Sequence, residues 1–179
     1  GHPVFEIPIQ PPSIPGMRLN AQLTRMASAK ARVILGSPLA AIHAADGRIQ
    51  AVDYASAGRA TRVETRAVIL AAGGFESGAL ELDSYGAVAD TVCGLPVMGP
   101  TGQLLHADFW GDEQPLFLAG LAVDDSMRVV DDTGTPVYTN LFAAGGNLAG
   151  ATRWREKSGE GIALASALAA VDAIVEELK

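Results

Sequence analysis

The chain has 179 residues, of which 49% are apolar, and its formal net charge is -7. This length and composition suit one globular domain with its own core. The acidic balance argues against binding to nucleic acid or direct docking on anionic lipid, because both need a basic surface. No apolar run reaches membrane-spanning length. Cys93 is the single cysteine, which indicates a reducing, cytoplasmic setting, and we expect it to be a small buried hydrophobe.

The first part of the chain, residues 1–16, is rich in proline, which excludes helix and favours an extended segment. Such a segment is either a rigid surface linker or the wall of a substrate channel. Residues 17–30 follow with apolar positions at helical spacing, so they predict a helix. A short strand is expected at residues 32–35, before a Gly-Ser-Pro break.

Residues 39–66 predict a three-stranded antiparallel meander with one exposed face. The strands are expected at residues 39–45, 48–54 and 62–66, and Asp46-Gly47 is a strong signal for the first turn. His43 lies in this region and is expected to be an ordinary surface histidine.

Two apolar runs end in the same way and predict buried parallel strands. Residues 67–72 are followed by Gly73-Gly74, and residues 141–144 are followed by Gly145-Gly146. Ligands of open α/β sheets bind at the carboxyl ends of strands, where glycines let a ligand approach the backbone. The alternative is a pair of ordinary strand-ending turns.

Residues 75–120 are rich in Gly, Pro and Asp and predict a cap or a substrate-domain remnant. His106 lies close to Asp108, so it is a weak candidate for a general acid or base. Residues 120–140 predict a hairpin with its turn at 132–134. The chain thus divides into residues 1–16, 17–74, 75–120 and 121–179.

The last segment contains an irregular polar loop at residues 148–157 and a helix from Gly161. Arg153 and Arg155 in the loop are either solvated charges or weak candidates for binding a phosphate or carboxylate. The helix N-terminus offers free N–H groups and a positive dipole end to an electron-rich ligand. The large apolar residues of the helix share one face: Leu164, Leu168, Val171, Val175 and Leu178.

Two motifs resemble the C-terminal segment of flavoproteins with two dinucleotide-binding domains. Residues 141–145 read Leu-Phe-Ala-Ala-Gly, and residues 159–163 read Gly-Glu-Gly-Ile-Ala. The proline stretch at residues 11–19 and the Gly-Gly-Phe-Glu-Ser-Gly run at 73–78 narrow the resemblance to one type of subunit among these flavoproteins. The chain resembles the B subunits of anaerobic glycerol-3-phosphate dehydrogenase and, more distantly, the flavoprotein subunits of fumarate reductase and succinate dehydrogenase, which belong to the same superfamily.

This resemblance implies a fold, a cofactor and a site. The fold would be mixed α/β, the C-terminal part of a Rossmann-like FAD/NAD(P)-binding domain, and the cofactor would be FAD or FMN. Asn147 stands where relatives often carry an acid that binds the ribityl chain, and no metal is expected. The expected flavin contacts are Gly73, Gly74, Gly145, Gly146, Asn147, Ser158, Gly159, Gly161 and Ile162.

The implied reaction is oxidation of sn-glycerol 3-phosphate to dihydroxyacetone phosphate, with electrons passed to a quinone chain. The implied partners are an A-type catalytic subunit and a membrane-anchoring iron–sulfur subunit, which would place the protein at the inner membrane on its cytoplasmic side. The alternatives are a fumarate reductase-like or ketosteroid dehydrogenase-like flavoprotein and a non-catalytic assembly domain.

The chain lacks a Gly-x-Gly-x-x-Gly fingerprint, the pattern that opens the dinucleotide-binding βαβ unit of such flavoproteins. We therefore expect this chain to be the C-terminal part of a longer polypeptide, without that N-terminal unit. Its sheet would then be incomplete, and an exposed edge could pair two copies into a homodimer.

Overall fold

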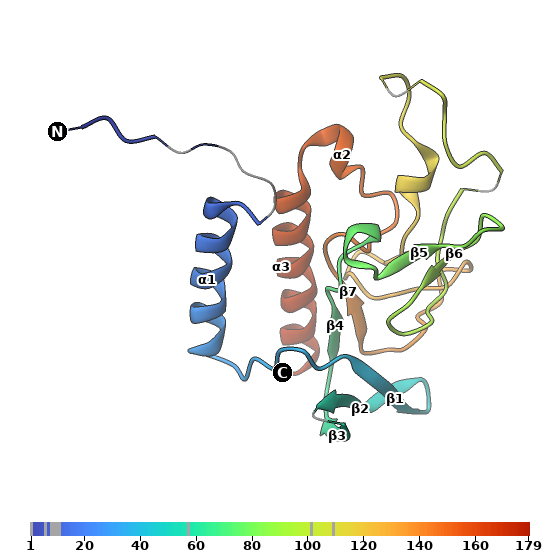
Figure 1. The fold of residues 1–179 in the computed structure, drawn as a ribbon. Helices are drawn as coiled ribbons and strands as arrows, with labels where there is room; N and C mark the ends of the chain where they lie inside the picture. Colours follow the sequence, from blue (N-terminus) through green and yellow to red (C-terminus); the bar gives the residue numbers. More distant parts are fainter. Residues whose placement is uncertain (1, 6, 8–11, 57, 101, 109) are drawn as a thin grey trace. The chain divides into compact units, whose positions relative to one another are not determined.

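The computed structural model describes residues 2–5, 7, 12–56, 58–100, 102–108 and 110–179. Two compact units are present, Gly1–Ser37 and Pro38–Lys179. The described helices and strands form a mixed α/β structure (Figure 1). None of the helices within the described residues is long and apolar enough to cross a membrane.

The first unit contains one helix, α1 (Ile14–Ser28). It begins three residues earlier than predicted, because Pro15 lies in the first turn, where a missing N–H is tolerated. The Ser13 side chain caps this turn by accepting a hydrogen bond of 3.1 Å from the Gly16 N–H. The expectation that prolines exclude helix was wrong at this position. Residues 1, 6 and 8–11 of the extended segment predicted at 1–16 lie outside the described residues.

The strand predicted at residues 32–35 is absent from the described structure, where these residues are exposed and irregular. A strand needs a neighbour that pairs with its N–H and C=O groups. Among the described residues of the first unit, none forms a strand that could serve as that neighbour.

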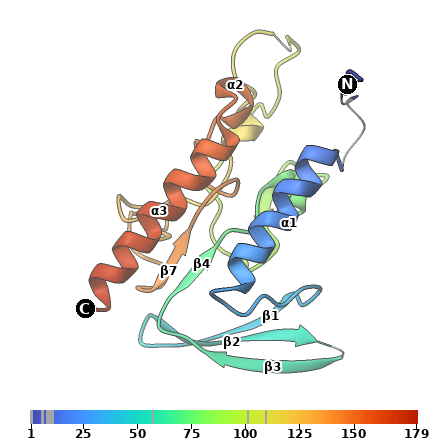
Figure 2. The same ribbon diagram turned by 90° about the vertical axis from the view of Figure 1, so that its left-hand side faces the viewer.

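The predicted meander opens the second unit as one antiparallel sheet (Figure 2). Its strands are β1 (Leu39–Ala45), β2 (Arg48–Ser56) and β3 (Arg59–Glu64). Asp46 and Gly47 form the first turn with φ of 51° and 69°, as the sequence predicts. The third strand begins three residues earlier than expected, because Ser56 pairs directly with Arg59.

The two predicted parallel strands, β4 (Val68–Leu70) and β7 (Leu141–Ala143), pair with each other in the register Val68 to Leu141 and Leu70 to Ala143. This confirms the buried parallel pairing, although the strands are shorter than the apolar runs. They lie in the main apolar cluster: Ile49, Leu70, Leu95, Leu121, Val129, Leu141, Ala143 and Leu148.

The segment between β4 and β7 is largely irregular. It contains the short 3-10 helices η1 (Phe75–Ser77) and η2 (Pro115–Leu118) and a hairpin of β5 (Leu80–Leu82) and β6 (Val88–Asp90). The turn predicted at residues 132–134 is present, with the Gly134 N–H donating to the Asp131 carbonyl at 3.1 Å. A second turn, at residues 124–127, was missed, and the pairing consists of isolated bridges.

Cys93 packs against the main apolar cluster, but it is half-buried rather than fully buried as expected. Burial, followed by the nearby Asp90 carboxylate, raises the pKa of its thiol to about 11. The thiol is therefore protonated at neutral pH, which agrees with a packing role and not with a nucleophilic one.

The C-terminal segment contains two helices instead of a loop and one helix. Residues predicted as loop include α2 (Arg153–Glu156), where the Thr152 hydroxyl donates to the Glu156 carboxylate at 2.5 Å. The long helix α3 (Gly159–Glu177) begins two residues before Gly161. The apolar face predicted for this helix is exposed at Leu164, Leu168, Val171 and Val175, and Ser166 and Ala170 are the buried side chains of α3. Small residues therefore make the contact with β7, beside which α3 runs in Figures 1 and 2.

Candidate functional site

The two glycine pairs predicted as ligand contacts meet at the carboxyl ends of β4 and β7. A Cβ atom placed on Gly74 would lie 2.7 Å from the Gly146 carbonyl oxygen, so neither backbone leaves room for a side chain there. Gly73 and Gly145 have φ of 84° and 81°, a left-handed conformation that side chains rarely adopt. We call the adjoining backbone of Gly74 and Gly146 the glycine surface.

Arg153 of α2 lies against this glycine surface. A Cβ atom on Gly146 would be 2.6 Å from Arg153 Nη1, and one on Gly74 would be 3.2 Å from Nη2. The guanidinium also forms an ion pair with Glu76 of η1, and about a quarter of the Arg153 side chain is exposed. Glu76 was not identified from the sequence, because the pair joins positions 77 residues apart.

The first turn of α3 is placed next to this arrangement, since a Cβ atom on Gly159 would be 3.9 Å from Arg153 Cβ. The Ser158 side chain does not cap the helix; its hydroxyl donates to Glu156 Oε2 at 2.8 Å. Hydrogen bonds from Thr152 and then from Ser158 lower the pKa of Glu156. Within the described part of the chain, the N–H groups of residues 159–161 have no acceptor.

The residues predicted to contact the flavin in the first turn of α3 and at the end of β7 have different surroundings. Gly161 has open space around its Cα, which a ligand or a side chain could fill. Ile162 packs instead against the apolar cluster, and its N–H donates to the Ser158 carbonyl at 2.8 Å. The Gly145 N–H donates to the buried Ser166 hydroxyl at 2.9 Å, which fixes α3 against the end of β7.

Asn147 is 2% exposed and carries an unusual acceptor. Its Nδ2 group donates to the Leu70 carbonyl at 3.0 Å, which ties the end of β7 to β4. Its Oδ1 atom is buried and has no hydrogen-bond partner among the described residues. A buried acceptor without a donor destabilises a protein, so this position is suited to a ligand hydroxyl or N–H group.

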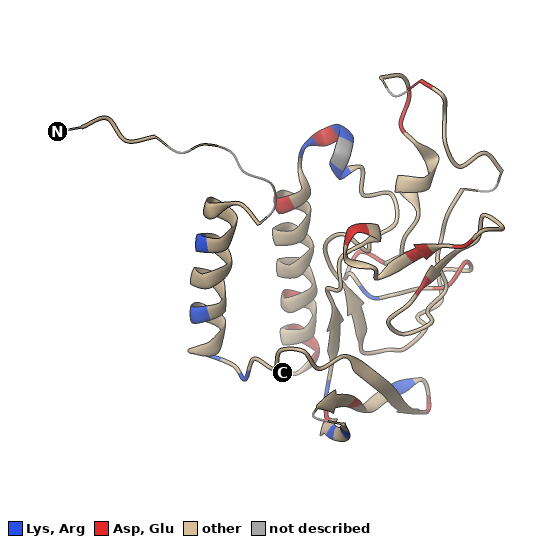
Figure 3. Cartoon of the chain, viewed as in Figure 1, with Lys and Arg blue, Asp and Glu red and all other residues tan. Residues whose placement is uncertain are grey.

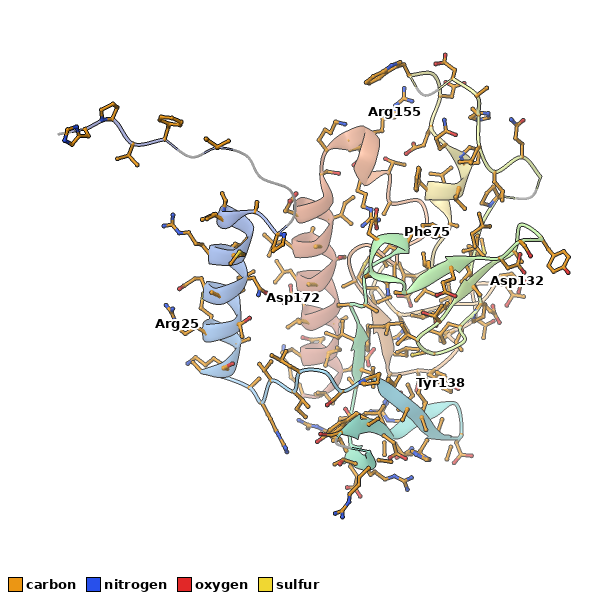
Figure 4. All side chains as sticks on the ribbon, viewed as in Figure 1. Arg25, Phe75, Asp132, Tyr138, Arg155 and Asp172 are labelled. Atoms are coloured by element: carbon orange, nitrogen blue, oxygen red, sulfur yellow. The ribbon has the colours of Figure 1, made fainter. Side chains whose placement is uncertain are left out.

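The weak candidates for catalysis are not brought together at this site by any described contact. The His106 N–H donates to Gln114 Oε1 at 2.6 Å, and the Asp108 carboxylate accepts from the Trp110 N–H at 3.0 Å. No hydrogen bond or ion pair within the described residues joins the His106 and Asp108 side chains. Arg155 is exposed on α2, and its Nη1 atom donates to the Gly111 carbonyl at 3.4 Å (Figure 4).

Sequence reasoning missed a charged network on the antiparallel sheet. Asp53 accepts from Arg62 Nε at 2.9 Å and lies 2.7 Å from His43 Nε2. His43 is therefore not an ordinary surface histidine. Alternation along the meander placed these three side chains on one face, which was the available signal. They adjoin a cavity of about 720 Å³, lined by His43, Gln50, Ala51, Arg62, Glu64, Thr65 and Arg66.

The family model of the FAD binding domain matches residues 1–162, and the chain belongs to this family. The chain is 30% identical over 182 residues to proteins of two strains of Halobacterium salinarum, each described as a probable B subunit of anaerobic glycerol-3-phosphate dehydrogenase. It is 26% identical over 179 residues to the B subunit of anaerobic glycerol-3-phosphate dehydrogenase of Glaesserella parasuis. The resemblance drawn from the motifs is thus confirmed.

These relatives are much longer than this chain. The alignments cover 99% and 96% of the chain but 42% and 41% of the relatives from Halobacterium and Glaesserella. No solved structure matches the chain significantly. FAD, one of the two flavins expected from the sequence, is the cofactor of the matched family.

The residues at the site fit a flavin nucleotide by their chemistry. The glycine surface packs the ends of β4 and β7 closely together beside the first turn of α3, and the first-turn amides of α3 can donate to electron-rich atoms. The buried Oδ1 of Asn147 lacks a donor, which a ribityl hydroxyl could supply.

Proposed function

We propose that the chain is part of a flavin-dependent oxidoreductase subunit that oxidises sn-glycerol 3-phosphate to dihydroxyacetone phosphate and passes the electrons to a quinone chain. The observation that carries this proposal is the similarity to glycerol-3-phosphate dehydrogenase B subunits over nearly the whole chain. The match to the FAD binding domain and the buried Asn147 Oδ1 atom without a donor support the flavin part. In this proposal, β4, β7 and α3 belong to a Rossmann-like dinucleotide-binding domain.

Bound FAD would supply the acceptor for the electron pair of the substrate alcohol. The chain's residues would then bind and orient the flavin. Gly73, Gly74, Gly145 and Gly146 would form the closely packed strand ends beside which the flavin lies, and Asn147 would accept a hydrogen bond from it. The first-turn amides of α3, with Ser158, Gly159 and Gly161, would stabilise negative charge through the helix dipole.

The quaternary part of the proposal follows the relatives' description as subunits. An A-type catalytic subunit and an iron–sulfur subunit that anchors the complex at the membrane would be the partners. The protein would then lie on the cytoplasmic side of the inner membrane, attached through those partners. Copurification of tagged chain with both subunits from its native host would support this arrangement.

The test separates cofactor binding from substrate oxidation. The purified chain is titrated with FAD and followed by the flavin absorption spectrum, and sn-glycerol 3-phosphate is then added without oxygen. We expect saturable FAD binding and bleaching of the flavin band by the substrate when the partner subunits are present. Binding without bleaching would contradict the substrate assignment, and absence of FAD binding would contradict the flavin role.

A matched pair of variants ties the result to the site. Asn147→Ala removes the buried acceptor, so we expect FAD affinity to fall about tenfold. Asn20→Ala, at an exposed asparagine of α1, is the control and leaves the affinity unchanged. Circular dichroism of both variants checks that the fold is retained.

A further inference from the structure

Arg153 is positioned to contact an anion that binds beside the glycine surface. Its two terminal nitrogens lie against Gly74 and Gly146, at the ends of the two parallel strands. These glycines come from segments 72 residues apart in sequence, and the guanidinium covers both. A small anion that binds beside Gly74 and Gly146 would therefore contact the guanidinium.

Glu76 holds the guanidinium from the side of β4. It lies in η1, two residues after Gly74, and pairs with Arg153 from the segment that follows β7. The ion pair therefore spans the two loops that leave the parallel strands. About 46% of the Glu76 side chain and 24% of the Arg153 side chain are exposed, so water competes with this pairing.

We propose that Arg153 recognises the phosphate group of the substrate, and that Glu76 holds its guanidinium over the glycine surface until that phosphate replaces the carboxylate. The inference rests on the proposed function, because it assigns the phosphorylated alcohol to the site beside the flavin. It adds to that function a specificity-determining residue and the carboxylate that competes with the substrate.

The exchange of carboxylate for phosphate is physically favourable. A partly exposed ion pair contributes little to stability, since solvent screens it. A phosphate monoester carries more negative charge than a carboxylate and offers oxygens that match the two parallel N–H donors of arginine. The first-turn amides of α3 lie next to Arg153 and provide further donors for an anion.

The same chemistry could come from the diphosphate of FAD, so the experiment distinguishes the two sources. Titration calorimetry measures binding of sn-glycerol 3-phosphate, glycerol and inorganic phosphate to the chain without flavin, and of FAD in a separate titration. The variants are Arg153→Gln, Arg153→Lys and Glu76→Gln. Arg59→Gln removes an equal charge from exposed β3 and is the control.

We expect Arg153→Gln to weaken binding of glycerol 3-phosphate and inorganic phosphate about tenfold or more, with FAD affinity within about twofold of wild type. Arg153→Lys should restore part of this loss, because lysine keeps the charge but not the bidentate geometry. Glu76→Gln should tighten phosphate binding about threefold, since the competing carboxylate is gone. The binding of glycerol should not differ between the variants. The control Arg59→Gln should bind the phosphate ligands as the wild type does.

Two results would overturn the inference. Loss of FAD affinity in Arg153→Gln with unchanged phosphate binding would assign the arginine to the cofactor diphosphate. Equal phosphate binding in wild type and Arg153→Gln would leave the ion pair with a structural role only. If FAD fails to bind but phosphate binding depends on Arg153, the flavin function fails while the anion site stands.

Discussion

Asn140 connects the antiparallel sheet to the parallel strands through one buried amide. Its Oδ1 accepts from the Ile49 N–H at 2.9 Å, and its Nδ2 donates to the Ile49 and Arg66 carbonyls at 2.8 and 2.9 Å. It is 1% exposed. Asn140→Ala would remove three hydrogen bonds at a buried position, although the Arg66 carbonyl would keep its hydrogen bond from Arg48 Nη2 at 2.7 Å. We therefore expect it to lower the free energy of unfolding by about 3 kcal/mol.

Urea denaturation at neutral pH measures this loss against Asn20→Ala, where an exposed asparagine of α1 is removed. The Asn20 variant should stay within about 0.5 kcal/mol of wild type. A similar small change for Asn140→Ala would mean that water replaces the lost amide and that the connection is weak.

Asp53 makes the stability of the fold depend on pH in the acid range. The hydrogen bond from Arg62, followed by that from His43, lowers the pKa of Asp53 well below its ordinary value. Because the folded pKa is lower than the unfolded one, the ionised carboxylate stabilises the fold above about pH 4 and loses this effect as the pH falls. Asp53→Asn should therefore unfold with a weaker pH dependence than wild type between about pH 5 and pH 2.

Thermal unfolding across this pH range provides the measurement. Asp112→Asn, at an exposed carboxylate without an ion pair among the described contacts, removes the same charge and should follow the wild-type curve. Parallel curves for wild type and Asp53→Asn would contradict the prediction.

At the scale of an element, the first turn of α3 combines a flexible backbone with open space. Apart from the adjacent residues and the nearby backbone of α3 itself, no described atom lies within 4 Å of a Cβ atom placed on Gly161, so alanine fits the ligand-free chain. Gly161→Ala should raise the free energy of unfolding by about 0.5 kcal/mol, because it reduces the freedom of the unfolded chain. The added methyl group should weaken FAD binding if the flavin approaches this turn.

The opposite signs of these two effects make the prediction specific. Differential scanning calorimetry without ligand gives the stability, and flavin fluorescence gives the FAD affinity. A variant with higher stability and unchanged FAD affinity would place the flavin away from Gly161. Ala165→Gly in the same helix is the reverse control, since it should lower stability and leave FAD binding unchanged.

The elements that the sequence predicts correctly are those with a local physical cause. Asp46-Gly47 tolerates positive φ and fixes the first hairpin, and apolar runs ending in glycine give the parallel pair. Residues 32–35 have strand-like composition, but pairing depends on a neighbour that local sequence does not specify. The sequence does not indicate the packing face of α3 either, because Ser166 and Ala170 are less apolar than the exposed leucines.

At the scale of the whole molecule, the sequence predicts which segments meet but not which side chains touch. Glycines after two parallel strands were expected to lie together, and Gly74 and Gly146 do. The pairing of Arg153 with Glu76 depends on where η1 and α2 place two long side chains, which no periodicity encodes. Figure 3 shows positions of both charge signs on α2, whereas the charged positions of α3 are all acidic.

The whole buried apolar cluster lies within residues 38–179, since its members run from Ile49 to Leu148. No side chain of α1 is buried. We therefore expect a chain of residues 38–179 to unfold in one cooperative transition, with a Tm within about 5 °C of the full chain. Calorimetry of both chains provides the measurement.

Removal of residues 153–179 should instead abolish cooperative unfolding, although it deletes fewer residues than removal of the N-terminal unit. It takes away the Ser166 hydroxyl that accepts from the Gly145 N–H and the ion pair from Arg128 to Glu177. It also exposes the glycine turn after β7 to water. Loss of cooperative unfolding in the 38–179 chain, with retention in the chain that ends at residue 152, would show that stability depends on the N-terminal unit rather than on the packing of α3 against β7.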